Sequence, residues 1–376
     1  MWRANNTPNP APQTWQWRHK NPGCGALPPQ WYVRAMSTEL SAEDALRLAV
    51  LLAGEVFAVR ISEGALTLHA LTPKGEAKVA LNPNCRPETY LTRVRETLGG
   101  HALGSPGGYP VHLRRWTRMG QSSPKNLAAL LTLGEPEAVA AVAHAPALTD
   151  ELARRAWWAS PTVEVARVML GHPEVRRGAM GRVLADFLIE NLPFEAEPMA
   201  AMSTVRAVLA ARVLDETALL SLWQKARRRP HYLIGFLEFL PDALPAEEPA
   251  RPLPAVVAQM PVNPWAAMMA RCYSPAGQTW LKAMELALDK APAHEAVYLL
   301  LDLVGGYFAS VRDADGREAL GGHECEVLAM AALAASSNQD AEDILVRTTA
   351  VGALLRKKID PLVAPLLGHL RVLQGR

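Results

Sequence analysis

The first regular pattern of apolar positions along the chain has the period of a helix. In the stretch STELSAEDALRLAVLLAG, Ser41 and Asp44 have the spacing of a capping box. Leu46, Val50 and Leu51 fall on one face of such a helix. The sequence therefore predicts an amphipathic helix that begins after Ser41 and packs into a core through these three apolar side chains.

Over residues 55–80 the period changes to two, which is typical of strands. EVFAVRIS, ALTLHALT and EAKVALN are separated by turns at Glu63-Gly64 and Pro73-Lys74-Gly75, so we expect a three-stranded antiparallel meander. The next stretch, PETYLTRVRETLGG, predicts a helix that stops at Gly99-Gly100. YPVHLRR predicts a last, short edge strand. The fold class predicted for this part is a small α+β domain, in which an antiparallel sheet packs with helices.

Beyond Gln121 the pattern is helical throughout. Ser123-Pro124, Ser160-Pro161, Ser274-Pro275 and Asp360-Pro361 each have the pattern of an N-cap followed by proline at the first helical position. GEPEAVAAVAHAPAL and SPTVEVARVMLGHPEV resemble each other at an offset of about 26 residues, the spacing of stacked helical hairpins. We therefore predict an all-α, HEAT-like body of helical hairpins. The alternative is an all-α bundle whose helices are separated by prolines.

These patterns predict five segments. Residues 1–36 form a leader, whose first 35 residues have six prolines and four tryptophans but no periodicity, so we expect it to be disordered, or translation to start at Met36. Residues 37–121 form the α+β domain and residues 123–245 the helical-hairpin repeat region. Residues 246–263 form a proline-rich linker and residues 264–376 a C-terminal helical bundle.

The composition is that of an ordinary globular protein, with 49% hydrophobic and 20% charged residues. Residues 1–35 carry four basic and no acidic side chains. The remainder has 35 basic and 37 acidic residues, a formal charge of −2, and so lacks the global positive field of nonspecific nucleic-acid binders.

Four cysteines without a CxxC motif favour a reducing cytoplasm. Because the uncharged run 252–270 contains four prolines, we expect no membrane span.

The glycine-rich stretch GSPGGYPVHLRRWTRMGQ is the densest candidate for a functional surface. Backbone amides in such a turn can bind an anion, arginines can clamp it, and an aromatic ring can stack on a base. The candidate partner- or anion-binding residues are Gly107, Gly108, His112, Arg114, Trp116 and Arg118. Alternation along the strand turns Arg115 toward the apolar face, so we predict that Arg115 docks the domain onto a carboxylate of the helical region. The alternative is a tight connection whose arginines face water or acidic side chains.

Other chemistry-bearing groups give weaker signals. His323-Glu324-Cys325-Glu326 has no second cluster of ligands, so we expect no metal site. Arg227-Arg228-Arg229 and Arg356-Lys357-Lys358 each fall in the last turn of a predicted helix, where cations favour the helix dipole. A basic patch for RNA or an acidic partner is the alternative. The sequence contains no recognisable combination of catalytic residues, so we assign no catalytic residues and expect no cofactor.

Two adjacent tryptophans give a further test of the helical prediction. In TDELARRAWWAS the apolar line Leu152, Ala156 and Ala159 faces the core, and neighbouring side chains on a helix point about 100° apart. We therefore expect that one of Trp157 and Trp158 is buried, and that the other covers the seam to a neighbouring hairpin.

A family resemblance covers residues 41–195. The runs LNPNCRPETYLTRVRETLGGHALGSPGGYPVHLRRWTRMGQ and LLTLGEPEAVAAVAHAPALTDELARRAWW resemble the sulfur reduction protein DsrS. That family belongs with the dissimilatory sulfite reductase gene cluster of sulfur-oxidising bacteria. The resemblance implies a soluble, cytoplasmic accessory or regulatory factor in sulfur oxidation. It brings no established catalytic residues to this chain.

Taken together, these patterns favour a non-catalytic binding protein that acts through contacts with protein or RNA in sulfur metabolism. The alternative is an enzyme, or a sensor of a small anion or nucleotide, with its site around Gly104–Arg118. A pocket lined by arginines would favour the sensor, whereas an open surface would favour the binding protein. The sequence does not specify the partner or the oligomeric state.

Overall fold

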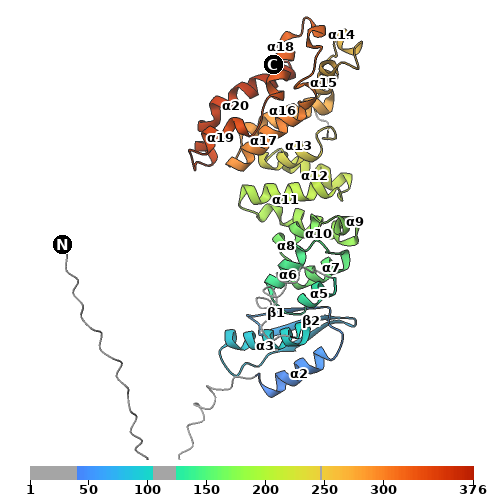
Figure 1. Ribbon diagram of the computed structural model, residues 1–376, viewed down its shortest axis with the longest axis vertical. Coiled ribbons are helices and arrows are strands. Elements are labelled where there is room, and N and C mark those ends of the chain that lie inside the picture. The colour runs from blue at the N-terminus through green and yellow to red at the C-terminus, as the bar shows by residue number, and fades with distance from the viewer. Residues whose placement is uncertain (1–39, 105–123, 246–247) are drawn as a thin grey trace, which may run out of the picture.

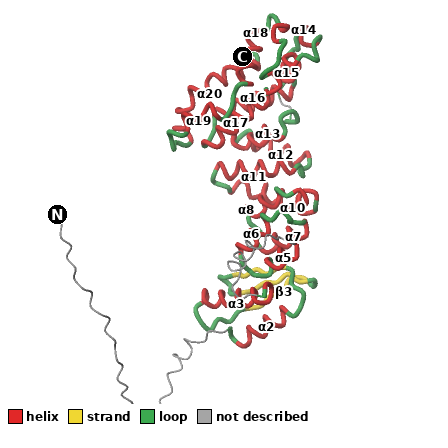
Figure 2. Tube along the Cα trace, in the orientation of Figure 1, coloured by secondary structure: helices red, strands yellow, loops and turns green. Residues whose placement is uncertain are grey.

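The computed structural model describes residues 40–104, 124–245 and 248–376. Within these ranges the protein is mostly helical, with one small antiparallel sheet near the N-terminal end (Figure 2). The sheet and two helices form a head, from which the remaining helices rise as an elongated stack along the long axis of the molecule (Figure 1). The coarse prediction, an α+β part followed by an all-α part, is confirmed.

The head contains a three-stranded meander of the predicted kind. Its strands are β1 (Ala58–Ser62), β2 (Thr67–Thr72) and β3 (Gly75–Ala80), and they pair in the order β1-β2-β3. Val59 lies opposite Ala70 in the first pair and Leu68 opposite Val79 in the second. The side chains of Val59, Leu68 and Ala70 are buried in the head's own core, as alternation predicts for a half-buried sheet.

The first helix of the head, α2 (Ala42–Leu52), begins where the sequence predicts, but it buries a different face. The Ser41 hydroxyl accepts a hydrogen bond from the Asp44 amide at 3.3 Å, so the N-cap is confirmed. Leu46 and Val50, however, are 66% and 68% exposed, while Leu48 and Leu52 are buried. The predicted apolar face is therefore wrong for Leu46 and Val50, whereas Leu51 is half-buried and packs against the core.

Asp44 explains this rotation of α2. Its carboxylate is buried and accepts hydrogen bonds from the Tyr90 hydroxyl at 2.5 Å and from the Asn82 amide at 2.7 Å. Positions four and eight residues after Asp44 share its face, which turns Leu48 and Leu52 inward. Burial and the hydrogen bond to Asp44 together raise the pKa of Tyr90. One internal carboxylate thus sets the orientation of the helix.

The second helix of the head, α3 (Pro87–Leu103), is longer than predicted. It passes through Gly99-Gly100 and ends at Gly104, which has a φ of 62° and donates its amide to the Gly100 carbonyl at 3.1 Å. The predicted stop at Gly99-Gly100 is wrong, because Gly99 is buried against the core and tertiary packing outweighs its poor helix propensity. The predicted strand YPVHLRR lies outside the described residues.

The first part of the stack consists of short helices joined by brief turns. They are α5 (Pro124–Leu130), α6 (Pro136–Ala143), α7 (Asp150–Ala159), α8 (Val163–Leu170), α9 (Pro173–Arg177), α10 (Ala179–Asn191), the 3₁₀ helix η1 (Leu192–Phe194), α11 (Pro198–Ala211), α12 (Glu216–Ala226), η2 (Pro230–Tyr232) and α13 (Leu233–Phe239). Neighbouring helices pack in pairs such as α6 with α7, α8 with α10 and α11 with α13.

The second part of the stack has longer helices. They are α14 (Ala255–Ala258), α15 (Pro264–Tyr273), α16 (Pro275–Asp289), α17 (His294–Tyr307), η3 (Ala309–Val311), η4 (Arg317–Leu320), α18 (Glu324–Ala334), α19 (Gln339–Leu345) and α20 (Gly352–Gln374). Helix α13 packs against α16 and α17, so the two parts are joined by direct contact. One hydrophobic cluster runs from Ala58 to Leu373 and so extends the length of the stack.

The Ser-Pro pairs predicted some helix starts correctly and others wrongly. Ser274 caps α16 by accepting a hydrogen bond from the Gly277 amide at 3.0 Å, as predicted. Ser160 does not cap α8, because the chain continues extended to Thr162, whose hydroxyl accepts from the Val165 amide. α5 begins at Pro124, while Ser123 lies outside the described residues.

The predicted helix start at Asp360-Pro361 is wrong, because α20 runs continuously past Pro361 and Pro365. Both prolines are exposed, so the carbonyl groups that lose their helical partners face water instead of the core. As a consequence, Arg356-Lys357-Lys358 lies in the first half of α20 rather than in the last turn of a helix. The helix dipole therefore does not explain these three cations.

Trp157 and Trp158 both lie at seams, and neither is fully buried. Trp157 packs edge-on against Phe187 of α10, with ring centroids 4.6 Å apart. Trp158 lies beneath the guanidinium of Arg60 in β1, 4.7 Å from its ring centroid. The prediction that one is buried is wrong, because Leu152, Ala153 and Ala156 occupy the buried positions of α7, so both rings lie at the edges of its buried face.

Candidate binding cleft

The glycine-rich loop lies almost wholly outside the described residues. This applies to the predicted binding residues Gly107, Gly108, His112, Arg114, Trp116 and Arg118, and to the predicted docking residue Arg115. Gly104, at the loop's first position, ends α3. The anion-site and docking assignments therefore stay predictions, and the candidate site must be sought among the described residues.

The head docks onto the stack through β1. The Val59 amide donates a hydrogen bond to the Leu131 carbonyl at 2.8 Å, which extends the sheet's hydrogen bonding onto the chain after α5. Arg60 lies over Trp158, and Arg155 of α7 lies 4.2 Å above the ring of Phe57. Arg60 and Arg155 thus join the head to the stack, whereas the predicted docking residue Arg115 stays a prediction. The two that the structure shows were not singled out from the sequence.

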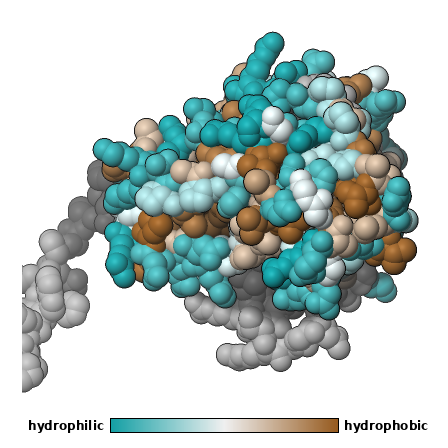
Figure 3. Space-filling view, turned by 90° about the horizontal axis from the view of Figure 1, so that it is seen from above, coloured by the Kyte–Doolittle hydropathy of each residue, from teal (hydrophilic) through white to brown (hydrophobic). Residues whose placement is uncertain are grey.

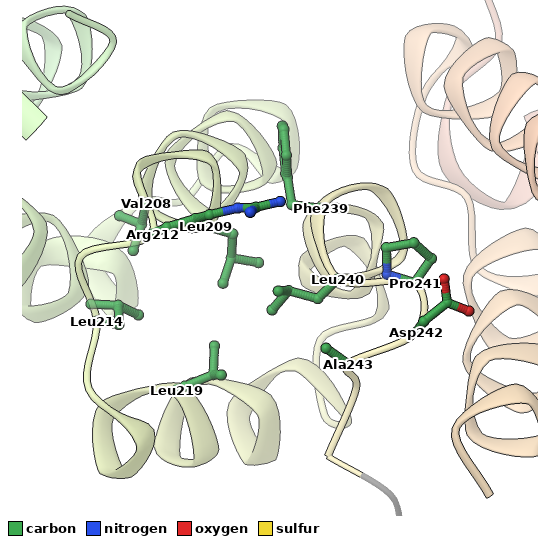
Figure 4. A pocket seen from close by; sticks show the side chains of 10 residues that line it. All are labelled: Val208, Leu209, Arg212, Leu214, Leu219, Phe239, Leu240, Pro241, Asp242 and Ala243. Carbon is green, nitrogen blue, oxygen red and sulfur yellow. The ribbon is translucent and has the colours of Figure 1, made fainter. Parts of the chain in front are cut away.

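An apolar cleft opens farther along the stack, between the ends of α11 and α13 and the start of α12 (Figure 4). Its volume is about 430 Å³. Most of its lining is aliphatic or aromatic: Val208, Leu209, Leu214, Leu219, Phe239, Leu240, Pro241 and Ala243, with Arg212 and Asp242 as the two charged members. A largely apolar concavity with few polar groups is the usual form of a ligand or side-chain pocket.

Local backbone geometry forms one wall of this cleft. α11 ends at Arg212, which adopts the left-handed conformation with φ 55° and ψ 36°. Such a conformation is uncommon for a residue with a Cβ, and it turns the chain sharply toward Leu214 and α12. The Arg212 side chain extends across the cleft toward Phe239 (Figure 4). The turn therefore places a guanidinium at the mouth of an apolar concavity.

The two charges of the cleft have different surroundings. Asp242 accepts two hydrogen bonds from Arg271, at 2.6 and 2.8 Å, and Arg271 also donates to the Tyr307 carbonyl at 2.9 Å. Arg212 is exposed, and among the described residues it has no hydrogen-bonding or ion-pair partner for its guanidinium. The negative charge is thus already neutralised, whereas the positive charge faces the cleft unpaired.

Two titratable side chains in the stack are held in unreactive forms. Burial raises the pKa of the Cys272 thiol to about 12, so it carries almost no thiolate at neutral pH. Burial, with the neighbouring Arg229, lowers the pKa of His231 to about 4, which keeps the imidazole neutral. Neither group lines the α11–α13 cleft. The cleft itself offers shape, apolar surface and one positive charge, which suit binding.

In the cluster His323–Glu326, the His323 imidazole lies 4.0 Å from the Glu326 carboxylate. In the part of the chain that the structure describes, no group of three or more histidine, cysteine or carboxylate side chains is arranged to hold a metal ion. Among the same residues, none of the helices combines the length and the apolar character that crossing a bilayer requires.

Comparisons with known proteins identify no relative. No family model matches the chain, and neither a curated protein nor a solved structure matches it. The fold and the cleft alone therefore describe an elongated helical protein with a small α+β head and an apolar cleft in its stack, with Arg212 as the unpaired charge of that cleft. The sequence analysis did not identify this cleft, because its residues come from three helices and the connections after α11 and α13, and none of them belongs to a motif.

Proposed function

We propose that this protein is a non-catalytic, cytoplasmic accessory or regulatory protein of bacterial sulfur oxidation, and that it acts by binding another protein in the α11–α13 cleft. The resemblance of residues 41–195 to DsrS supports the process. The paired packing of α6 with α7, α8 with α10 and α11 with α13 supports a HEAT-like arrangement, which is a common scaffold for protein recognition.

The observation that carries the proposal is the unpaired guanidinium of Arg212 above an apolar cleft. An apolar concavity alone would accept many occupants, but a single positive charge at its mouth selects one with a carboxylate beside an apolar group. A leucine or phenylalanine next to an acidic residue has this chemistry. The expected occupant is therefore a short apolar and acidic segment of a partner protein.

The size of the cleft limits how strongly it can bind alone. Burying one leucine or phenylalanine contributes about 1.5–3 kcal/mol, and a charge-assisted hydrogen bond adds about 1.5–3 kcal/mol. Association itself costs about 4–15 kcal/mol. The cleft is thus an anchor, and a stable complex needs further contacts along the stack, where Leu220 of α12 is 41% exposed.

The charge distribution of the stack favours a protein over RNA. RNA binding requires cations that are free to neutralise phosphates. Many arginines between α7 and α15 already pair with carboxylates: Arg154 and Arg155 with Glu151, Arg167 with Glu195, Arg182 with Asp186 and Asp215, Arg206 with Glu238, and Arg271 with Asp242. Phosphates would have to displace these carboxylates.

The test is capture of partners from an extract of a sulfur-oxidising bacterium, followed by measurement of Kd with the purified partner. Arg212→Glu reverses the charge at the cleft and should weaken binding at least tenfold. Arg228→Glu is the matched control, because Arg228 is also exposed but belongs to the run Arg227-Arg228-Arg229, for which a basic patch for RNA or an acidic partner is the alternative interpretation. Binding should survive both ribonuclease and Arg228→Glu.

Three results would overturn the proposal. The first is an unchanged Kd for Arg212→Glu, and the second is loss of the partner on ribonuclease treatment or with Arg228→Glu. The third is that the extract yields no protein that binds the purified chain directly. Circular dichroism of each variant shows whether the helices remain folded.

A further inference from the structure

Helix α18 has an unusual distribution of apolar residues for a helix at the surface. From Val327 to Ala335 its sequence contains no charged or hydrogen-bonding side chain. One face, with Val327, Met330 and Leu333, is buried against the stack. The opposite face carries Cys325, Leu328, Ala331, Ala332 and Ala335, which are exposed or half-buried. Both faces of α18 are therefore apolar.

Helix α18 lies near the end of the described stack farthest from the head (Figure 1). Seen from that end, the surface shows several hydrophobic patches among hydrophilic residues (Figure 3). Leu328 is 66% exposed. The outermost helix of a helical stack normally presents a polar face to water. An exposed apolar face at this position is therefore a candidate contact surface.

A cleft of about 370 Å³ lies directly beside Leu328, between η4 and α18. Its lining is Arg317, Glu318, Leu320, Gly321, Glu324, Val327, Leu328 and Ala331. A projecting leucine and an apolar cleft thus occur side by side on one patch. Two such patches related by a twofold axis are complementary, because each leucine can enter the opposite cleft.

The charged side chains at the rim of this cleft are compatible with a twofold pairing of two copies. The patch carries one cation, Arg317, and two carboxylates, Glu318 and Glu324. Arg317 pairs with Glu318 at 3.2 Å, but both side chains are largely exposed, so this pair contributes little and is easily exchanged. A patch with both signs of charge can satisfy itself across a twofold axis, with Arg317 of one copy facing a carboxylate of the other.

We propose that α18 and the cleft beside it form the surface through which two copies of this chain pair, with Leu328 of each copy entering the cleft of the other. The contact comprises one short helix and a turn, which places it among small interfaces, below about 1,200 Å² in total. The dimer should therefore be reversible and dependent on concentration. The proposal is independent of the α11–α13 cleft.

Sedimentation equilibrium over a wide range of concentrations is the first test. The full chain should dimerise, and Leu328→Glu should raise the dimer Kd at least about a hundredfold, since two buried leucines are lost at once. Val346→Glu is the control: Val346 is 74% exposed but lies after α19, outside the patch. A wild-type chain that stays monomeric would overturn the proposal. So would dimerisation that survives Leu328→Glu or is abolished by Val346→Glu.

Cys325 supplies a second test, because it lies one turn before Leu328 on the same face. In a chain with Cys24→Ser and Cys85→Ser, diamide should oxidise two Cys325 thiols from paired copies. Each thiol loses a proton, the two electrons reduce the diamide, and an Sγ–Sγ bond joins the copies. Adding Leu328→Glu should abolish the cross-linked dimer. Equal cross-linking with and without Leu328→Glu would refute the assigned surface.

Discussion

Gly305 and Gly306, neighbours in the last turn of α17, have opposite surroundings, and alanine substitutions test the packing of α17 against the end of α18. A Cβ at Gly305 would lie 2.0 Å from the carbonyl oxygen of Ser336, which follows α18. A Cβ at Gly306 would meet nothing within 4 Å. The two substitutions are chemically identical and one residue apart, so their difference isolates this close approach.

The magnitudes follow from two opposing effects. Alanine in place of glycine inside a helix gains about 1 kcal/mol at either position. At Gly305 the added methyl must displace backbone, and overpacking of this kind costs about 1–3 kcal/mol or more. Gly306→Ala should therefore stabilise the protein slightly, while Gly305→Ala should be less stable than Gly306→Ala by about 1–3 kcal/mol.

Guanidinium denaturation followed by circular dichroism, with both variants and the wild type measured in parallel, provides the comparison. Arg312 reinforces the site by donating hydrogen bonds to the Gly305 and Ala334 carbonyls, at 3.1 and 2.7 Å. If Gly305→Ala unfolds at the same denaturant concentration as Gly306→Ala, α17 does not approach Ser336 as closely as described, and the position of α18 is wrong.

Two further predictions concern the head and the pH dependence of stability. Arg155→Ala removes the contact with Phe57 and should cost about 1 kcal/mol and make the head more susceptible to proteolysis. Arg154 pairs only with Glu151 in the described structure, so Arg154→Ala is the control and should leave the head as resistant to protease as in the wild type. Equal proteolysis of the two variants would contradict the docking of the head through Arg155. His231 has its pKa lowered to about 4 by burial, so the unfolded chain binds the extra proton first as the pH falls. Stability should therefore decrease from pH 6.5 toward pH 4. His231→Gln should flatten this part of a plot of Tm against pH, and an unchanged slope would show that His231 titrates normally.

Local patterns predicted the elements better than they predicted which faces are buried. The meander and the caps at Ser41 and Ser274 depend on neighbouring residues, and all are confirmed. The buried face of α2 depends on Asp44 meeting Tyr90, 46 residues away, which no local pattern reveals. α20 passes through Pro361 because that residue faces water, and exposure is likewise a property of the tertiary structure.

The same limit applies to the candidate sites. Sequence reasoning favoured the glycine-rich loop because its unusual residues are consecutive. The α11–α13 cleft combines Leu209, Leu219 and Phe239 from three helices with an arginine at a helix end. Each of these residues is ordinary in its own segment. Only the fold brings them together, so no reading of composition or spacing could have found the cleft.

The hydrogen bond from Val59 to Leu131 has a consequence for how this chain can be divided. β1 is an outer strand of the described sheet, and the body covers part of its backbone edge at that point. An uncovered strand edge is a template for pairing with another chain. A fragment that ends before residue 124 would lose this cover and expose β1, so it should form assemblies larger than the proposed α18 dimer at concentrations where the full chain does not. The stack therefore guards the head against aggregation.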